Sequence, residues 1–419
     1  MIDVKAVRED PKKIIQAMKA KNADVDIPAF LECDQKRREV MKCVEDLRAQ
    51  QKRANEGIAA ASGEQREEKI QAMRIIAQEA RCLEKDLAIL DVQWMRMLLR
   101  FPNPALPDVK VGKDETKNEV IKTVGTPRTR EEGMKDYLTL CAPHDWVDTD
   151  RAGKVSGTRF GYIKGDLARL EFALVSFVMD RLMPKGFIPV VPPTLVKEPA
   201  MRGMGYLERG EDEIYQTKQD GFFLIGTSEQ SIGPMHQDDI FLRTELPRRY
   251  VAFSTCYRRE AGSYGKDTKG ILRVHQFDKV EMFCFTLPEQ SDTEHEFLLA
   301  CEEDLVQALE LPYHVLKMCT GDLGDPAARK YDIECWIPSE QTYRETHSTS
   351  TCTDFQARRL NIRYRKEHGG QGTVHTLNGT AFAIGRTLIA LIENHQQPDG
   401  SVRIPAALQP YLGGKARIP

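Results

Sequence analysis

The sequence lacks several features that would each point to a particular class of protein. No stretch approaches the roughly 20 consecutive apolar residues that a membrane helix needs. The first ten residues carry charges where a secretory signal would have its apolar core. The ten cysteines are scattered singly, without a C-x-x-C pair, which argues against a zinc ribbon and against a disulfide framework. These absences predict a cytoplasmic protein with reduced thiols and no membrane association.

Two common signatures of nucleotide binding are also missing. The chain has no G-x-x-x-x-G-K-[ST] loop and no G-x-G-x-x-G motif opening a helix, and Gly265-Lys266 is followed by aspartate. If the protein binds a nucleotide, side chains must therefore hold the phosphates. The formal net charge is only -3 over 419 residues, so a large anionic partner would have to meet a local basic face.

Apolar residues instead recur in alternating steps of three and four along two runs of the N-terminal part. The first run is Val40, Val44, Leu47, Ala54 and Ile58, with polar Gln51 filling one position, and the second is Met73, Ile76, Ala80, Leu83, Leu87, Leu90, Trp94 and Met97. Such spacing is the seam of a coiled coil. A short joint lies between the runs, with Gly63 expected to end the first helix. The pattern predicts an antiparallel helical hairpin over about residues 28–100.

The first helix of this hairpin carries a run of basic residues. They are Lys36, Arg37, Arg38, Lys42, Arg48, Lys52 and Arg53. Charge runs on coiled coils are usually solvated surface, whereas a contact with the phosphate backbone of an RNA helix is the alternative. The hairpin alone does not decide between the two.

The chain changes character at about residue 157, where short β-rich runs, turn residues and amphipathic helices begin. Residues 188–193 predict an edge strand broken by prolines, and residues 250–257 and 279–286 predict two strands with alternating faces. Strands interspersed with helices, without regular βαβ alternation, favour an α+β domain on an antiparallel sheet. We therefore expect an N-terminal domain over 1–104, a linker over 105–156 and a second domain over 157–419.

The densest group of reactive side chains lies around the loop between those two strands. Arg258 and Glu260 are two apart, so in a strand they would share one face. A guanidinium suits a phosphate through paired hydrogen bonds, and a carboxylate can accept from an amine. Arg273, Phe277 and Glu281 follow the loop at intervals of four and add a cation, an aromatic ring and a second carboxylate. A surface hairpin with salt bridges is the plainer interpretation.

The stretch from Cys256 to Glu281 resembles motif 2 of the class II aminoacyl-tRNA synthetases, and its residue sequence is similar to that of the seryl-tRNA synthetases in particular. Further stretches resemble the same family in order: residues 186–193 (motif 1), 226–229 (the loop that seats serine), 343–348, 356–365 and 377–387 (motif 3). The resemblance covers the whole chain, because the family also opens with a long antiparallel coiled coil. It implies a class II catalytic domain whose antiparallel sheet is flanked by helices.

The resemblance also implies roles for individual residues. The implied ATP ligands are Arg258, Glu260, Arg273, Val274, Phe277, Glu345, Thr346, Ser348 and Arg386, of which Arg258 and Arg386 would be catalytic. The implied serine ligands are Thr227, Glu229, Arg258, Glu281, Asn378 and Thr380. Glu345 and Ser348 would hold Mg²⁺, and the basic run from Lys36 to Arg53 would contact tRNA.

The activity implied is ATP-dependent formation of seryl-adenylate and transfer of serine to tRNA(Ser), and also to tRNA(Sec), by a homodimer. Three alternatives stay open at this stage. The first is a paralogue that delivers the amino acid to a carrier protein or metabolite, although such proteins usually lack the long arm. The second is a non-enzymatic RNA-binding or coiled-coil regulator, which would not need the ATP and metal ligands. The third is a second, specialised synthetase.

Overall fold

The computed structural model describes residues 1–59, 61–129, 133–262 and 269–419. The chain divides into two compact units. One comprises residues 2–19 and 23–102, and the other comprises residues 103–419 together with residues 1 and 20–22. Across the described ranges, every helix is too short or too polar to cross a bilayer.

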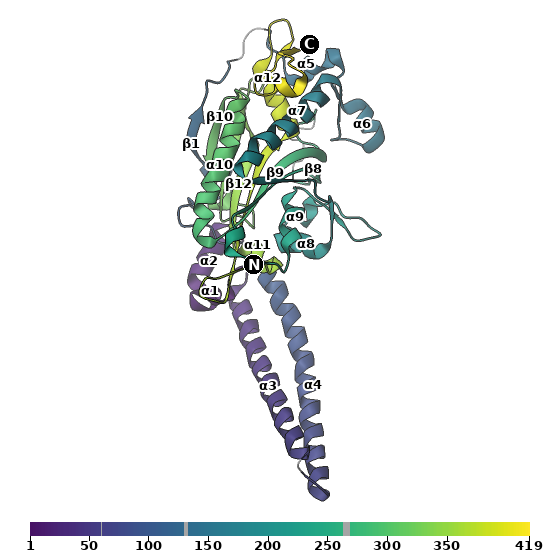
Figure 1. Ribbon diagram of the computed structural model, residues 1–419, viewed down its shortest axis with the longest axis vertical. Coiled ribbons are helices and arrows are strands. Elements are labelled where there is room, and N and C mark those ends of the chain that lie inside the picture. Colours follow the sequence, from purple (N-terminus) through teal and green to yellow (C-terminus); the bar gives the residue numbers. More distant parts are fainter. Residues whose placement is uncertain (60, 130–132, 263–268) are drawn as a thin grey trace. The chain divides into compact units, whose positions relative to one another are not determined.

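The first unit is built on two long helices that lie side by side, α3 (Ile27–Ala59) and α4 (Glu64–Leu99) (Figure 1). Two short helices, α1 (Val4–Glu9) and α2 (Pro11–Ala20), precede them. All the predicted seam positions are buried or half-buried, which confirms the hairpin. Gly63 differs from the expectation: with φ 59° it stands immediately before α4 as its N-cap, and α3 has already ended at Ala59.

The base of the hairpin has a small core of its own. The Phe30 ring stacks on Trp94 at 6.1 Å between ring centroids and meets the edge of Phe101 at 5.1 Å. Asp34 is fully buried beside these rings, where it accepts hydrogen bonds from the Trp94 indole at 3.0 Å and from Arg8 at 2.7 Å and 2.8 Å. These paired hydrogen bonds satisfy a carboxylate that would otherwise be costly to bury.

The second unit contains an eight-stranded sheet with the order β1-β10-β11-β12-β15-β9-β8-β4. Its strands are β1 (Glu119–Val124), β4 (Phe187–Val190), β8 (Arg248–Tyr257), β9 (Gln276–Thr286), β10 (Tyr313–Lys317), β11 (Arg329–Ile337), β12 (Thr342–Thr353) and β15 (His375–Ala383). The predicted edge strand is β4, and the two predicted inner strands lie within β8 and β9. The predicted antiparallel sheet is confirmed, and one edge adds a parallel pair, because β4 runs parallel to β8.

Shorter elements complete this unit. Residues 105–156, expected to be a linker, contain β1, α5 (Tyr137–Cys141), β2 (Val147–Asp148) and α6 (Thr149–Ser156). Further short helices and strands outside the large sheet are β3 (Tyr162–Ile163), β5 (Leu195–Val196), α8 (Glu198–Met204), β6 (Phe223–Leu224), α9 (Glu229–Ile232), β7 (Ile240–Phe241), α11 (Phe355–Leu360), β13 (Arg363–Arg365), β14 (Gln371–Thr373), β16 (Val402–Arg403) and β17 (Arg417–Ile418).

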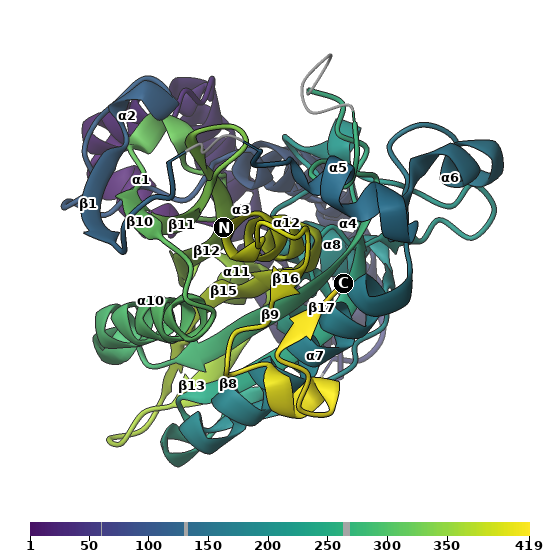
Figure 2. The ribbon, with the colours of Figure 1, turned by 90° about the horizontal axis from the view of Figure 1, so that it is seen from above.

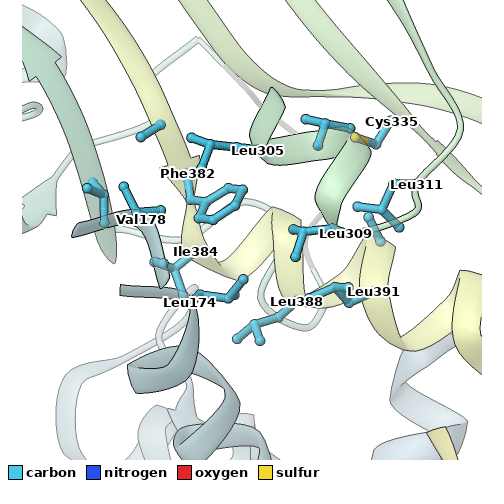
Figure 3. Close-up of a cluster of buried hydrophobic side chains, with 14 of the residues drawn as sticks. Leu174, Val178, Leu305, Leu309, Leu311, Cys335, Phe382, Ile384, Leu388 and Leu391 are labelled. Atoms are coloured by element: carbon cyan, nitrogen blue, oxygen red, sulfur yellow. The ribbon is translucent and has the colours of Figure 1, made fainter. Parts of the chain in front are cut away.

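The main core lies on one face of the sheet, under α7 (Gly165–Leu182), α10 (Ser291–Ala308) and α12 (Ile384–His395) (Figure 2). Figure 3 shows leucines of these three helices meeting around Phe382 of β15. Along β9, Val280 and Met282 point into this core, whereas Phe283 and Phe285 join a second cluster on the other face. Because side chains alternate along a strand, Lys279 and Glu281 share the face opposite the helices.

Candidate active site

A cavity opens on the sheet face that carries Lys279 and Glu281, and Lys279 is one of its lining residues. Strands β9, β12 and β15, the first turn of α12 and the segments flanking the loop after β8 form its wall. Of the residues that the sequence implicates, nine line it: Arg258, Glu260, Arg273, Val274, Phe277, Glu345, Thr346, Thr380 and Arg386. Segments more than 120 residues apart in the sequence therefore contribute to one site.

Arg258 and Glu260 meet in this cavity, although not for the reason that we expected. Strand β8 ends at Tyr257, and Glu260 has a left-handed φ of 53°, so strand alternation does not place the pair. The Arg258 Nε donates to the Gly226 carbonyl oxygen at 3.2 Å. Its guanidinium lies 5.3 Å from the centroid of the Phe277 ring, a cation–π contact that fixes a positive charge beside an aromatic face.

Two arginine–carboxylate pairs span the cavity wall. Arg273 Nη1 lies 2.8 Å from Glu260 Oε2, and Arg386 Nη1 lies 3.3 Å from Glu345 Oε2. Burial alone would raise the pKa of Glu345, but the charges of Arg386, Lys330 and Arg258 outweigh it and lower that pKa to about 2. The Glu345 carboxylate is therefore ionised at neutral pH.

A β-bulge brings Glu345 and Ser348 to the same face of β12. Positions three apart in a regular strand would point in opposite directions. The pairing of β12 with β11 shifts by one residue here, so Glu334 faces Glu345 while Asp332 faces Ser348. Since Asp332 and Glu334 share a face of β11, the extra residue on β12 gives Glu345 and Ser348 a common face too.

At the other end of the cavity, a buried lysine links three residues implicated in serine binding. Lys279 Nζ donates to Thr227 Oγ1 at 2.7 Å and lies 2.5 Å from Glu281 Oε2. The same Glu281 oxygen accepts from Thr380 Oγ1 at 3.2 Å. Sequence reasoning missed Lys279, which itself lines the cavity. The sequence shows opposite charges at 279 and 281, which share one face of β9, but it does not show their burial.

Glu229 and Asn378 lie behind the cavity wall. Glu229 is buried, and one of its oxygens accepts from the Tyr206 hydroxyl. Its other oxygen, Oε2, has no hydrogen-bond partner within the described residues. Burial and then the negative charge of Glu281 raise the pKa of Glu229 to about 7. Asn378 is two residues before Thr380 on β15, and its amide donates to Cys352 Sγ at 3.8 Å.

The site can hold a metal ion only if substrate phosphates or water supply some of its ligands. In the described ranges, no group of three or more His, Cys, Asp or Glu side chains could hold a metal ion. Glu345 is an ionised carboxylate in the cavity wall, and Ser348 lies on the same face of β12, outside the residues that line the cavity. Mg²⁺ is commonly bound by one or two protein groups together with substrate phosphates and water, so these residues fit a cation that arrives with a polyphosphate.

The predicted tRNA-binding residues all lie on α3, and four of the seven already have acidic partners. These pairs are Lys36–Glu32 at 2.7 Å, Arg37–Asp91 at 2.5 Å, Arg38–Asp34 at 3.1 Å and Arg48–Glu84 at 2.9 Å. Lys42, Lys52 and Arg53 are exposed and take part in none of the ion pairs found among the described residues. The basic run is therefore partly structural and partly open to a ligand.

Comparison with known proteins gives matches along the whole chain. Residues 1–105 match the seryl-tRNA synthetase N-terminal domain, and residues 213–395 match the class II tRNA synthetase core domain (G, H, P, S and T). The serine–tRNA ligase of Cutibacterium acnes is 45% identical over 100% of this chain and 99% of its own length. That of Acidothermus cellulolyticus is 44% identical over 99% and 98%.

Solved structures give the same picture. The crystal structure of seryl-tRNA synthetase from Pyrococcus horikoshii complexed with ATP has a TM-score of 0.92 and 38% identity, covering 100% of this chain and 99% of that one. The cytoplasmic serine–tRNA ligase from Naegleria fowleri in complex with AMP has a TM-score of 0.86 and 30% identity, covering 98% and 95%.

Proposed function

The chain belongs to the seryl-tRNA synthetase family, and we propose that its cavity joins L-serine to ATP as seryl-adenylate before serine passes to tRNA(Ser). One observation carries the proposal. A single cavity is lined by an aromatic ring, by two arginine–carboxylate pairs, and by Lys279 and Thr380, which both contact the buried Glu281. The ring and the arginines suit a nucleotide, and the Lys279–Glu281–Thr380 network suits a small polar amino acid.

The ATP end is assigned by chemistry. Phe277 stacks on adenine, the Glu260 carboxylate accepts from the adenine amino group, and Val274 packs beside them. Arg258, Arg273 and Arg386 take the phosphates. The serine carboxylate attacks the α-phosphorus and pyrophosphate leaves, so negative charge accumulates where these guanidinium groups are already fixed. The attacking carboxylate is ionised before the reaction, so this step needs no general base.

Glu345 and Ser348 would hold Mg²⁺ at the phosphates, with Thr346 between them on the same strand. The ion, when bound, supplies positive charge against the departing pyrophosphate. Glu345 is suited to this role because its low pKa keeps it an anion over the whole physiological range.

The amino-acid end is assigned to the serine ammonium, carboxylate and hydroxyl groups. Thr227 and the unpartnered oxygen of Glu229 receive the ammonium, and Arg258 pairs with the carboxylate. Glu281 and Thr380 bind the hydroxyl, with the Asn378 amide beside them. Alanine should be rejected by about 10⁴-fold, because buried polar groups would lose their partner, whereas threonine must be excluded by size, worth only about 10- to 200-fold.

The hairpin arm serves tRNA in this proposal, and the chain works as a cytoplasmic homodimer. Lys42, Lys52 and Arg53 are the exposed cations available to a phosphate backbone. Large apolar side chains exposed on or near the β4 edge support dimerisation, since soluble monomers rarely leave such groups together in water. They are Ile188 on β4, and Val191 and Leu195 in the segment that follows it. The same arm would accept tRNA(Sec) as well as tRNA(Ser).

The test is pyrophosphate exchange with each of the 20 amino acids, followed by charging of total tRNA. Serine alone should support exchange. Sequencing of the acylated tRNA should identify it as tRNA(Ser) or tRNA(Sec). Exchange with another amino acid in preference to serine would remove the assignment. Exchange without any tRNA charging would favour a paralogue that uses another acceptor.

A further inference from the structure

Lys279 occupies an unusual place for a lysine. Only 5% of its surface is exposed, and its charge lies inside the sheet face with Thr227 at 5% and Glu281 at 2% exposure. A buried ammonium is costly unless an opposite charge and hydrogen-bond acceptors surround it. Lys279 has both, since its Nζ contacts the Glu281 carboxylate at 2.5 Å and the Thr227 hydroxyl at 2.7 Å.

These two contacts join two parts of the chain that are about 50 residues apart in the sequence. Thr227 lies in the segment just before α9, and Glu281 lies on β9, paired across the sheet with Thr380 of β15. The Lys279 side chain contacts Thr227 of the first segment and Glu281, which lies two residues further along its own strand. A single ammonium thus sets the distance between the group assigned to the serine ammonium and the group assigned to the serine hydroxyl.

We propose that Lys279 is a positioning residue for the amino-acid half of the site, an inference that rests on the proposed serine-binding function. Its ammonium occupies an acceptor position of the Thr227 hydroxyl, which leaves the hydroxyl proton and another lone pair for the substrate. It also places a positive charge against the buried Glu281 carboxyl group, at 2.5 Å from Oε2. Lys279 acts through its partners and is not itself a catalytic residue.

The inference predicts a selective loss of serine binding. Lys279→Met keeps the length of the side chain and removes the charge, so Glu281 is left as an unpaired buried carboxylate. The serine KM in pyrophosphate exchange should rise by roughly 30-fold or more, as expected when one partner of a buried charge pair is lost. The ATP KM should stay within about threefold, because no ATP ligand contacts Lys279. Lys279→Gln, which can still donate to Thr227, should give a smaller rise.

A double variant separates positioning from a general loosening of the sheet. In the Glu281→Gln background no buried carboxylate remains to be compensated, so adding Lys279→Met should raise the serine KM by less than about fivefold. This variant also lacks the unpaired charge and guards against misfolding of Lys279→Met. Lys317→Met is the matched control, since Lys317 is a strand lysine of the same sheet paired with Asp108 at 2.6 Å, and it should leave both KM values unchanged.

Three results would overturn the inference. They are a serine KM within threefold of wild type in Lys279→Met, an ATP KM that rises in proportion, and fully multiplicative effects in the double variant. Failure of the underlying function looks different, because the wild-type protein itself would then show no serine-dependent exchange. Wild-type exchange with an unaltered Lys279→Met removes only the role of Lys279.

Discussion

Arg386 holds Glu345 twice, through its carboxylate oxygen Oε2 at 3.3 Å and through its main-chain carbonyl oxygen at 2.9 Å. The cation assigned to phosphate and the anion assigned to Mg²⁺ therefore form an ion pair in the cavity wall. Under the proposed function, phosphate would compete with the Glu345 carboxylate for the Arg386 guanidinium. Arg273 and Glu260 form a second such pair on the side assigned to adenine.

Arg386→Ala should nearly abolish amino-acid activation while leaving the fold intact. A positioned arginine at a transferring phosphoryl group is worth about 10³-fold or more, so serine-dependent pyrophosphate exchange should fall by that factor. Arg403→Ala is the control, because Arg403 pairs with Glu310 on the surface at 2.7 Å, and it should exchange normally. Exchange within tenfold of wild type in folded Arg386→Ala protein would remove the role given to Arg386.

Glu281 and Thr380 should control serine and not ATP. Thr380→Val replaces the hydroxyl by a methyl of similar size, and Glu281→Ala removes the acceptor at the other end of their 3.2 Å hydrogen bond. Each should raise the serine KM by about 10-fold or more, as for a lost buried hydrogen bond, with a much smaller change for ATP. Equal increases in both KM values in steady-state exchange assays would show that the assignment is wrong.

The sequence predicted the residue types of the site better than their arrangement. Arg258, Glu260, Arg273 and Phe277 could be grouped because they flank one loop. The bulge at Thr346 could not be predicted, because a one-residue shift in strand pairing leaves no pattern in the local sequence. Lys279 was missed for a related reason: a charged residue inside a strand is informative only when its burial is known.

Shortening the arm should separate activation from charging. Arg37 faces Asp91 and Arg48 faces Glu84 across the hairpin, so removing residues 46–84 and closing the gap with a short glycine-rich turn leaves Val44 opposite Leu87. The ring cluster of Phe30, Trp94 and Phe101 stays whole, and the unit should fold. Pyrophosphate exchange should stay within about twofold because no cavity residue is touched, whereas aminoacylation should fall by at least about 100-fold if the arm supplies several phosphate contacts. Charging at wild-type efficiency would make the arm purely structural.

The basic residues of α3 should not contribute equally to tRNA binding. Replacing exposed Lys42, Lys52 and Arg53 by alanine should weaken binding and reduce the slope of log Kd against log salt by about one per contacted phosphate. Replacing Arg38, which pairs with buried Asp34, should instead lower the unfolding midpoint of the first unit. Filter binding over a salt series and thermal unfolding distinguish the two effects. An unchanged salt slope in the triple variant would place tRNA elsewhere.

Glu171 of α7 should make stability depend on pH. Burial, followed by the neighbouring Asp278, raises its pKa to about 8 from the usual 4.5. The folded state therefore binds this proton more tightly than the unfolded state, so its contribution to stability is complete below about pH 4.5 and is lost as pH rises to about 8. Glu171→Gln should unfold at a higher temperature than wild type at pH 8.5, with a smaller advantage at pH 5. A difference independent of pH would contradict this.

The fold was predictable where periodicity is strong and unpredictable where pairing is non-local. The steps of three and four from Met73 to Met97 predict α4, because the helical period within this one segment determines which residues share its buried face. The parallel pairing of β4 with β8 joins Phe187 to Arg249, more than 60 residues later, and an alternating pattern carries no information on strand direction. All but the last residue of β1 are exposed, so this strand has no buried face that an alternating pattern could mark.

The two ends of the eight-stranded sheet bear on how the protein behaves at high concentration. A free strand edge invites open-ended addition of further strands and hence aggregation. At one end, Pro189 lies within β4, and Pro192 and Pro193 follow it, so this edge lacks several N–H donors. At the other end, β1 carries a bulge between Val120 and Lys122, together with the charge of Lys122. Both edges thus disfavour open-ended, amyloid-like addition of further strands.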